Sequence, residues 1–253
     1  MTPAVADKHI TLTDVAVRYL LLTEDQRTFK GRVLNLFSNN SNTAEFWALE
    51  NISLNVAPGE IVGMVGRNGS GKSTLLRVMA RIIEPSRGTV DVSGEISPLL
   101  ELGSAFSGEL TGRENAFLYG AMFKFTREEM DELMPRIVAF SELGSFFDIP
   151  IKCYSSGMVA RLAFAVSTQV RPDILLIDEV FAVGDDEFQK KCFFRVRKMI
   201  ERGSIVVLVS HSSPLIEQLC NRVIYLQKGQ VRGDGKPREV LTQYHRESSQ
   251  EAT

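Results

Sequence analysis

The chain has 253 residues, of which 44% are hydrophobic and 24% are charged, and its formal net charge is -2. This length suits one large domain or two closely packed lobes with an ordinary globular core. A charge so near zero leaves no overall basic footprint. The composition therefore gives no sign of an overall nucleic-acid footprint and leaves a local basic patch open.

The cysteines and the apolar runs exclude further classes. Cys153, Cys192 and Cys220 lie far apart without metal-ligand or redox spacing, which predicts reduced thiols in a cytosolic protein. Residues 1–10 contain no apolar core, so we expect no signal peptide. No apolar run approaches the ~20 residues of a membrane-spanning helix. We expect a partner to provide any membrane part.

The first third of the chain is predicted to be mainly β-structure. Ile10–Tyr19 and Ile52–Val56 alternate apolar and polar residues, as half-buried strands do. Between them, Arg27–Phe37 mixes basic and apolar residues. This segment suits either a basic amphipathic helix at a lipid surface or, as we favour, a short helix packed on the β-structure.

A parallel α/β unit is predicted next. The apolar run Ile61–Val65 enters a glycine-rich loop, and Ser73–Ile83 then has helical periodicity. Helical patterns dominate between residues 111 and 170, where Thr126 and Glu129 form a capping-box signature. We expect Pro135 to break this region or to start a new helix.

The C-terminal part is predicted to alternate strands and helices. Short buried strands are expected at Ile174–Ile177, Ile205–Val209 and Val223–Leu226. A hairpin turn is expected at residues 228–229. Pro237 is expected to open a last helix, followed by a polar, frayed tail from Glu247.

Gly66–Ser73 matches the pattern of a P-loop, which binds the phosphates of a nucleotide. Glycines let successive backbone N–H groups face the phosphates, and the helix that follows points its positive end there. Lys72 would contact the β- and γ-phosphates of ATP, and the Ser73 hydroxyl would bind Mg²⁺. The predicted nucleotide-binding residues of this segment are Gly66, Asn68, Gly69, Ser70, Gly71, Lys72, Ser73 and Thr74.

A second motif supplies carboxylates. The buried strand from Ile174 ends at Asp178 and Glu179, where a parallel sheet forms its ligand crevice. Asp178 can hold the magnesium through water, and Glu179 can accept a proton from the attacking water. Two solvated acids would be the simpler interpretation of this segment alone, but the P-loop favours the catalytic one. His211 follows another strand and is predicted to contact the γ-phosphate.

Ser155, Ser156 and Gly157 precede a helical stretch from Val159 to Gln169. Serines at the start of a helix either bind anions or cap the helix, and the sequence physics leaves both interpretations open.

The order of these motifs resembles the ATP-binding cassette family, over nearly the whole chain. The resemblance implies an α/β fold: a P-loop NTPase (RecA-like) core, an N-terminal antiparallel β lobe and a helical lobe. It implies one nucleotide-binding domain over residues 1–246. The β lobe and core would occupy about 8–100 and 171–236, the helical lobe about 105–170, and a polar tail 247–253. Ser155, Ser156 and Gly157 would contact the γ-phosphate held by a second copy, so that a homodimer encloses two ATP molecules.

A narrower resemblance is to the cassettes that export bacterial surface polysaccharides. It rests on segments 100–103, 109–115, 154–158 and 178–185. It implies an ATPase at the cytoplasmic face of the inner membrane, peripheral and paired with a transmembrane permease dimer in a 2:2 complex. The cargo would be O-antigen, capsule or teichoic acid on a lipid carrier, with no nucleic acid. A chain that stops at Thr253 would be a short form without a C-terminal carbohydrate-binding domain.

The sequence departs from the family pattern at three positions. No glutamine lies between the expected third strand and the helical lobe, so Glu101 is the candidate for the magnesium position. Ser156 replaces the usual second glycine of the signature motif, and Met158 replaces its glutamine. We expect the permease to contact the region from Glu101 to Asn115.

The aromatic residue that stacks on adenine is the least constrained part of the site. We choose Tyr19 because it ends the first strand, with Phe46 or Trp47 as alternatives. Three other functions remain open: an exporter of a drug, lipid or peptide, a soluble cassette protein of translation or DNA repair, and a regulator without turnover.

Overall fold

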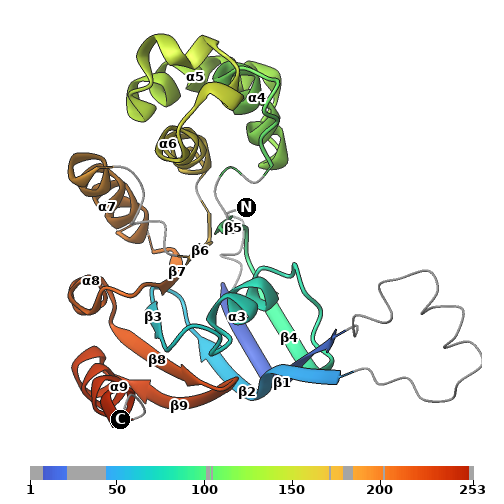
Figure 1. The fold of residues 1–253 in the computed structure, drawn as a ribbon, viewed down its shortest axis with the longest axis vertical. Coiled ribbons are helices and arrows are strands. Elements are labelled where there is room, and N and C mark those ends of the chain that lie inside the picture. Colours follow the sequence, from blue (N-terminus) through green and yellow to red (C-terminus); the bar gives the residue numbers. More distant parts are fainter. Residues whose placement is uncertain are drawn as a thin grey trace, which may run out of the picture.

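The structure is a computed structural model that describes residues 8–21, 44–100, 103, 105–170, 172–178, 185–201 and 203–250. These residues form a three-stranded sheet, a six-stranded sheet and a helical lobe (Figure 1). The expected helix at Arg27–Phe37 lies outside the described residues. Within the described ranges, no helix combines the length and the apolar character that crossing a membrane requires.

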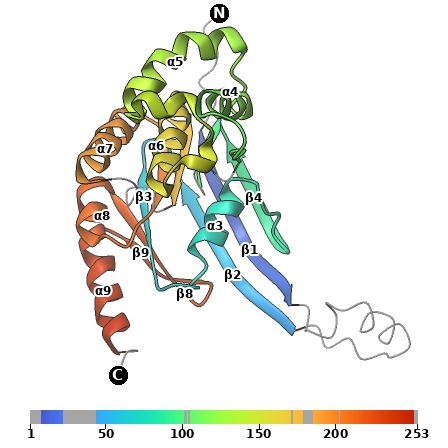
Figure 2. The same ribbon diagram turned by 45° about the horizontal axis from the view of Figure 1, so that its top comes forward.

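The β lobe is the antiparallel sheet β2–β1–β4, made of β1 (His9–Leu21), β2 (Ala44–Val56) and β4 (Arg87–Ser93). Figure 2 shows these strands side by side. The two alternating segments are thus confirmed as strands, but both strands are longer than expected. The pairing of β1 with β2 shifts register near Val15 and Val17. Such bulges interrupt the period of two on which the prediction rested.

The core sheet has the order β5–β6–β7–β3–β8–β9. Its strands are β3 (Ile61–Val65), β5 (Ile96–Leu99), β6 (Ile174–Asp178), β7 (Ile205–Val209), β8 (Arg222–Gln227) and β9 (Gln230–Gly235). All neighbours are parallel except β9, which pairs antiparallel with β8. Every residue of β7 is buried, as expected for a central parallel strand.

The predicted hairpin turn joins β8 and β9. Lys228 and Gly229 both have positive φ, 48° and 76°, as a two-residue type I′ turn requires. The hairpin prediction is therefore confirmed.

Helices cover the core sheet and follow its strands. They are α3 (Lys72–Met79), α7 (Asp186–Ile200), α8 (Ser213–Leu219) and α9 (Pro237–Gln250). The first ends before Ile83, because Arg81 adopts the left-handed conformation with φ of 58°. Pro237 opens the last helix, as predicted. That helix continues through Gln250, so the frayed tail expected from Glu247 is wrong for these residues.

The helical lobe contains α4 (Gly112–Met122), α5 (Arg127–Ser141), η1 (Gly144–Asp148), η2 (Ile151–Cys153) and α6 (Ser156–Ser167). It lies at the top of Figure 1. The capping box of Thr126 and Glu129 is present, which confirms that prediction.

Pro135 lies inside α5, so the break expected there is wrong. A proline removes the hydrogen bond to the carbonyl group four residues earlier, here that of Asp131. Both Asp131 and Pro135 are exposed, so water can reach that carbonyl group. The cost of the proline is therefore lower than in a buried helix.

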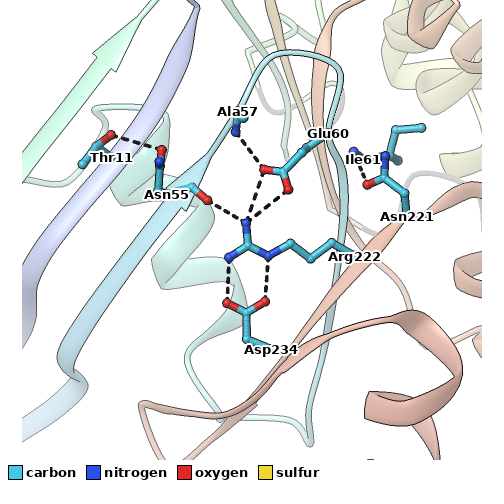
Figure 3. Close-up of polar contacts among 8 residues, drawn as sticks. All are labelled: Thr11, Asn55, Ala57, Glu60, Ile61, Asn221, Arg222 and Asp234. Atoms are coloured by element: carbon cyan, nitrogen blue, oxygen red, sulfur yellow. Dashed lines mark hydrogen bonds and ion pairs between the residues drawn. The ribbon is translucent and has the colours of Figure 1, made fainter.

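Arg222 joins the β lobe to the core sheet (Figure 3). Its Nε and Nη2 atoms each donate to Asp234 at 2.7 Å. Nη1 donates to the carbonyl oxygen of Asn55 at 2.6 Å and to Glu60 at 3.3 Å. The hydrogen bond to Asp234 raises the pKa of Arg222 above its usual value. Asn221 accepts from the first amide of β3 at 3.0 Å. These contacts fix the strand that leads into the P-loop.

Candidate nucleotide site

Three parallel strands end at one level of the core sheet. In the register of the sheet, Val209 is opposite both Met64 of β3 and Asp178 of β6. The P-loop, His211 and Asp178 therefore emerge at the same edge. Ligands of open parallel sheets bind at this carboxyl edge. The structure brings together the three motifs that the sequence placed at strand ends.

Two P-loop glycines are required by close approaches of the backbone. A Cβ atom at Gly66 would lie 2.2 Å from the carbonyl oxygen of Leu226. At Gly71, which has φ of 104°, it would lie 2.7 Å from the carbonyl oxygen of Ala48. A larger residue at either position would push the loop away from the two sheets that support it.

Lys72 lies under the loop. Its Nζ atom donates to the carbonyl oxygens of Gly66 at 2.7 Å and Arg67 at 3.1 Å, and the residue is only 7% exposed. The Ser70 hydroxyl is buried nearby and has no hydrogen-bond partner among the residues that the structure describes. Buried hydroxyl groups in proteins nearly always have a hydrogen-bond partner, so the Ser70 hydroxyl indicates a site for a polar ligand. A triphosphate offers an acceptor for the Ser70 hydroxyl and negative charge beside the Lys72 ammonium group.

A cavity of about 320 Å³ opens over the loop. It is lined by Tyr19, Phe46, Ala48, Asn68, Gly69, Gly71, Lys72, Ser73 and Thr74. The lining thus combines two aromatic rings with hydroxyl groups, glycines and one ammonium group. This combination suits a nucleotide, whose base stacks on rings and whose phosphates accept hydrogen bonds.

The aromatic residues of the β lobe divide between its two faces. Tyr19 and Phe46 are directly opposite each other on β1 and β2, and both line the cavity. Trp47 is absent from the lining; the guanidinium groups of Arg18 and Arg87 lie over its ring at 5.7 and 5.1 Å. The structure therefore keeps Tyr19 and Phe46 as candidates for the adenine contact, and it removes Trp47 from the cavity.

The oxygen donors suit magnesium. The Ser73 hydroxyl is exposed at the start of α3, and Asp178 ends β6 half-buried. Among the described residues, no group of three His, Cys, Asp or Glu side chains could hold a metal ion. Mg²⁺ commonly takes few protein ligands and completes its shell with phosphate oxygens and water. Glu101 and Glu179 lie outside the described residues, so their assignments stay predictions.

The predicted signature residues start α6. The Ser155 side chain accepts a hydrogen bond from the Met158 amide at 3.2 Å and thus caps the helix, while Ser156 is exposed and Gly157 half-buried. None of the three lines the cavity over the P-loop. Within one chain the signature therefore serves as a helix cap and does not reach the chain's own P-loop cavity.

The stretch from Thr111 to Asn115 has a structural role that the sequence interpretation missed. Asn115 is fully buried, and its Nδ2 atom donates to the carbonyl oxygens of Ser107, Leu110 and Thr111. Thr111 also forms a capping box with Glu114. The capping-box rule that found Thr126 and Glu129 would have found this pair too.

This stretch is joined to the segment before the signature. The amides of Ile151 and Lys152 donate to the carbonyl oxygens of Leu110 at 2.9 Å and Gly108 at 3.0 Å. Lys152 also pairs with Glu109 at 2.7 Å. A displacement of residues 108–111 would therefore move the start of α6.

Comparison with known proteins agrees with this geometry. The family model described as ABC transporter matches residues 49–182. The chain is 46% identical over 200 residues to the O-antigen export system ATP-binding protein RfbB of Klebsiella pneumoniae, covering 79% of this chain and 81% of the relative. It is 41% identical over 213 residues to the teichoic acids export ATP-binding protein TagH of Bacillus anthracis, covering 84% of this chain and 39% of the relative.

Other relatives extend the comparison. The ABC transporter protein AbcA of Aeromonas salmonicida is 45% identical over 201 residues, and the match spans 79% of this chain and 65% of that protein. Among solved structures, a dimeric ATP-binding cassette in a post-hydrolysis state, bound to ADP and Pi, superposes with a TM-score of 0.72 at 25% identity. That match covers 90% of this chain and 99% of the other.

Proposed function

The chain belongs to the ABC transporter family, and from this premise we propose that it is the ATP-hydrolysing subunit of a polysaccharide exporter. The cargo is a lipid-linked surface glycan such as O-antigen, capsule or teichoic acid. The energy of ATP hydrolysis drives it across the cytoplasmic membrane. The observation that carries the proposal is the cavity over the P-loop, in a chain whose relatives are named as O-antigen and teichoic acid export proteins.

The residues of the site divide the work on ATP. The Nζ atom of Lys72 donates to two carbonyl groups of the P-loop, so its positive charge lies inside the loop. There it attracts the β- and γ-phosphates. Ser73 and Asp178 would hold Mg²⁺, and the bound ion would supply positive charge against the phosphates. Glu179 takes a proton from the attacking water, and His211 contacts the γ-phosphate from the end of β7.

Hydrolysis requires two copies of the chain. Ser155, Ser156 and Gly157 face the γ-phosphate held by the second copy, since they do not line the cavity of their own chain. ATP binding closes the dimer and hydrolysis opens it, because the contacts to the γ-phosphate exist only in the closed state. Two such subunits work with two permease subunits at the cytoplasmic face of the membrane.

The Glu179→Gln variant tests the enzymatic part of the proposal. It should bind ATP with the affinity of the parent, lose nearly all turnover and stay dimeric with ATP. Binding, phosphate release and sedimentation measure these properties. Glu187→Gln is the matched control, because Glu187 is an exposed carboxylate in the first turn of α7. Hydrolysis at the parent rate in Glu179→Gln would refute the assignment of the base.

Deletion of the gene tests the cargo. We expect the surface glycan to be lost and its lipid-linked precursor to accumulate inside the cell, and the gene in trans to restore export. An unchanged surface glycan would instead support the export of a drug, lipid or peptide. Co-purification with ribosomes or DNA and without a membrane fraction would indicate a soluble cassette protein.

A further inference from the structure

Arg161 lies on α6, six residues after Ser155, and contacts two other helices. Its Nη1 atom donates to Glu142, the C-cap of α5, at 3.0 Å. Its Nη2 atom donates to Asp185, the N-cap of α7, at 2.6 Å. Its guanidinium group also lies over the ring of Phe188, 4.6 Å from the centroid. One side chain thus holds three helices together.

The neighbouring charges complete this junction. Lys191 of α7 pairs with the other oxygen of Glu142. The hydrogen bond from Lys191 lowers the pKa of Glu142, and the backbone amide of Phe188 lowers the pKa of Asp185. Both carboxyl groups are therefore ionised at neutral pH, so Arg161 makes two charge-assisted hydrogen bonds. The Arg161 side chain is only 16% exposed, whereas the side chains of Glu142 and Asp185 are 39% and 65% exposed, so water reaches the carboxylate side of both contacts.

An aromatic cluster lies beside the charges. Phe140 of α5, Phe164 of α6 and Phe188 of α7 contact one another, with centroid distances from 5.6 to 6.3 Å. Phe164 and Phe188 also belong to the hydrophobic core around β6. Figures 1 and 2 both show α7 beside α6. The contact between the signature helix and α7 is therefore packed as well as charged.

The two helices joined by Arg161 start near different nucleotide sites. α6 begins at the signature, which by the proposed function faces the ATP of the second copy. β6 ends at Asp178, which by the proposed function faces the chain's own ATP, and α7 starts soon after it in the chain, at Asp186. Arg161 thus connects elements that belong to two different nucleotide sites.

We propose that Arg161 is a positioning residue that couples the two ATP sites of the dimer, by holding the signature helix against the start of α7. This inference rests on the proposed function. A displacement at one site is transmitted through the Arg161–Asp185 contact to the other site. The planar guanidinium group can bind both carboxylates at once, which a lysine cannot do in the same geometry. Loss of the contact should leave each site able to bind ATP but should weaken the closed dimer.

The experiment uses the full chain with Glu179→Gln as the parent, because that variant should hold the closed dimer. Asp185→Asn is the decisive variant: asparagine caps a helix as well as aspartate does, so α7 keeps its cap while Arg161 loses its charged partner. Arg161→Met and Arg161→Lys are made in parallel. Arg197→Met is the control, because Arg197 also pairs with a carboxylate, but this is Glu201, the C-cap of the same helix.

ATP affinity is measured at a concentration where the chain is monomeric, and ATP-driven dimerisation by sedimentation. We expect Asp185→Asn and Arg161→Met to bind ATP within twofold of the parent. Dimerisation should weaken about five- to hundredfold, the range of an ordinary coupling free energy. The dimerisation affinity of Arg161→Lys should lie between that of these two variants and that of the parent. Arg197→Met should dimerise with the affinity of the parent.

The unfolding temperature shows whether a variant dimerises weakly because the two sites are uncoupled or because the chain is less stable. If Arg161→Met unfolds at the assay temperature, the test of coupling rests on Asp185→Asn alone, because that variant keeps the cap of α7 and the packing around it. Dimerisation of a folded Asp185→Asn at the parent affinity would overturn the inference, while leaving the proposed function intact. A parent that binds no ATP would instead overturn the proposed function, and the inference with it.

Discussion

Gly112, the first residue of α4, lies against the hydroxyl group of Tyr154, the residue that precedes the signature. A Cβ atom at Gly112 would lie 2.2 Å from the Tyr154 Oη atom and 2.9 Å from the carbonyl oxygen of Phe147. The same hydroxyl group donates to the carbonyl oxygen of Phe146 at 2.6 Å. The glycine of the Thr111–Asn115 stretch thus makes room for the tyrosine that anchors the start of α6.

Gly112→Ala should therefore lower the free energy of unfolding by about 1–3 kcal/mol, the usual cost of overpacking. Thermal or urea unfolding measures it. Gly108→Ala is the matched control, since its added Cβ would meet nothing closer than 3.8 Å. Tyr154→Phe removes the clashing oxygen, so the double variant with Gly112→Ala should recover part of the loss. An alanine at residue 112 as stable as one at residue 108 would contradict this packing.

The P-loop offers a graded pair of substitutions. Gly69→Ala strains only the backbone, because φ is 78° and the added Cβ would have no neighbour within 4 Å. A left-handed alanine costs about 1–2 kcal/mol. Gly71→Ala adds a collision with the carbonyl oxygen of Ala48 at 2.7 Å. We expect Gly69→Ala to weaken ATP binding moderately and Gly71→Ala to abolish it, as measured by titration. Equal affinities would show that the loop can move away from β2.

The sequence predicted the core sheet well because its strands are short apolar runs with clear ends. Ile61–Val65 and Ile205–Val209 were predicted to the residue, since a strand buried on both faces needs no alternation. The P-loop followed from residue types at fixed spacing, and Asp178 followed from its place at the end of a buried strand; the roles of both toward ATP stay predictions. The helical pattern between Thr111 and Val170 and the resemblance to the family also predicted the helical lobe.

The rest depended on contacts between distant residues. The early start of β2 at Ala44 depends on pairing with β1 across register shifts, which local periodicity does not reveal. The uninterrupted helix at Pro135 depends on exposure, which a propensity rule does not include. The ion pair between Arg161 and Asp185 joins residues 24 apart in the chain, and nothing local to either of them predicts it.

Tyr19 and Phe46 provide a test of adenine stacking. Replacement of either ring by alanine should raise the dissociation constant for ATP about 5- to 100-fold, since stacking of a base on an aromatic ring contributes about 1–3 kcal/mol. The ring that stacks should show the larger effect, and ATP should compete with other nucleoside triphosphates less well in that variant. Trp47→Ala is the control from the other face of β2 and should bind ATP as the parent does. Weak binding only in Trp47→Ala would refute the position of the cavity.

The three cysteines should differ sharply in reactivity. Burial raises the pKa of Cys192 and of Cys220 to about 12, whereas Cys153 is exposed two residues before Ser155. A thiol with that pKa is about one ten-thousandth thiolate at pH 8, and the thiolate is the reactive form. The native chain should therefore release one equivalent of chromophore from Ellman's reagent at pH 8, and three in guanidinium chloride. Cys153→Ser should abolish the native reaction. A fast second equivalent in that variant would show that the packing of α7 or of the Cys220 region opens in solution.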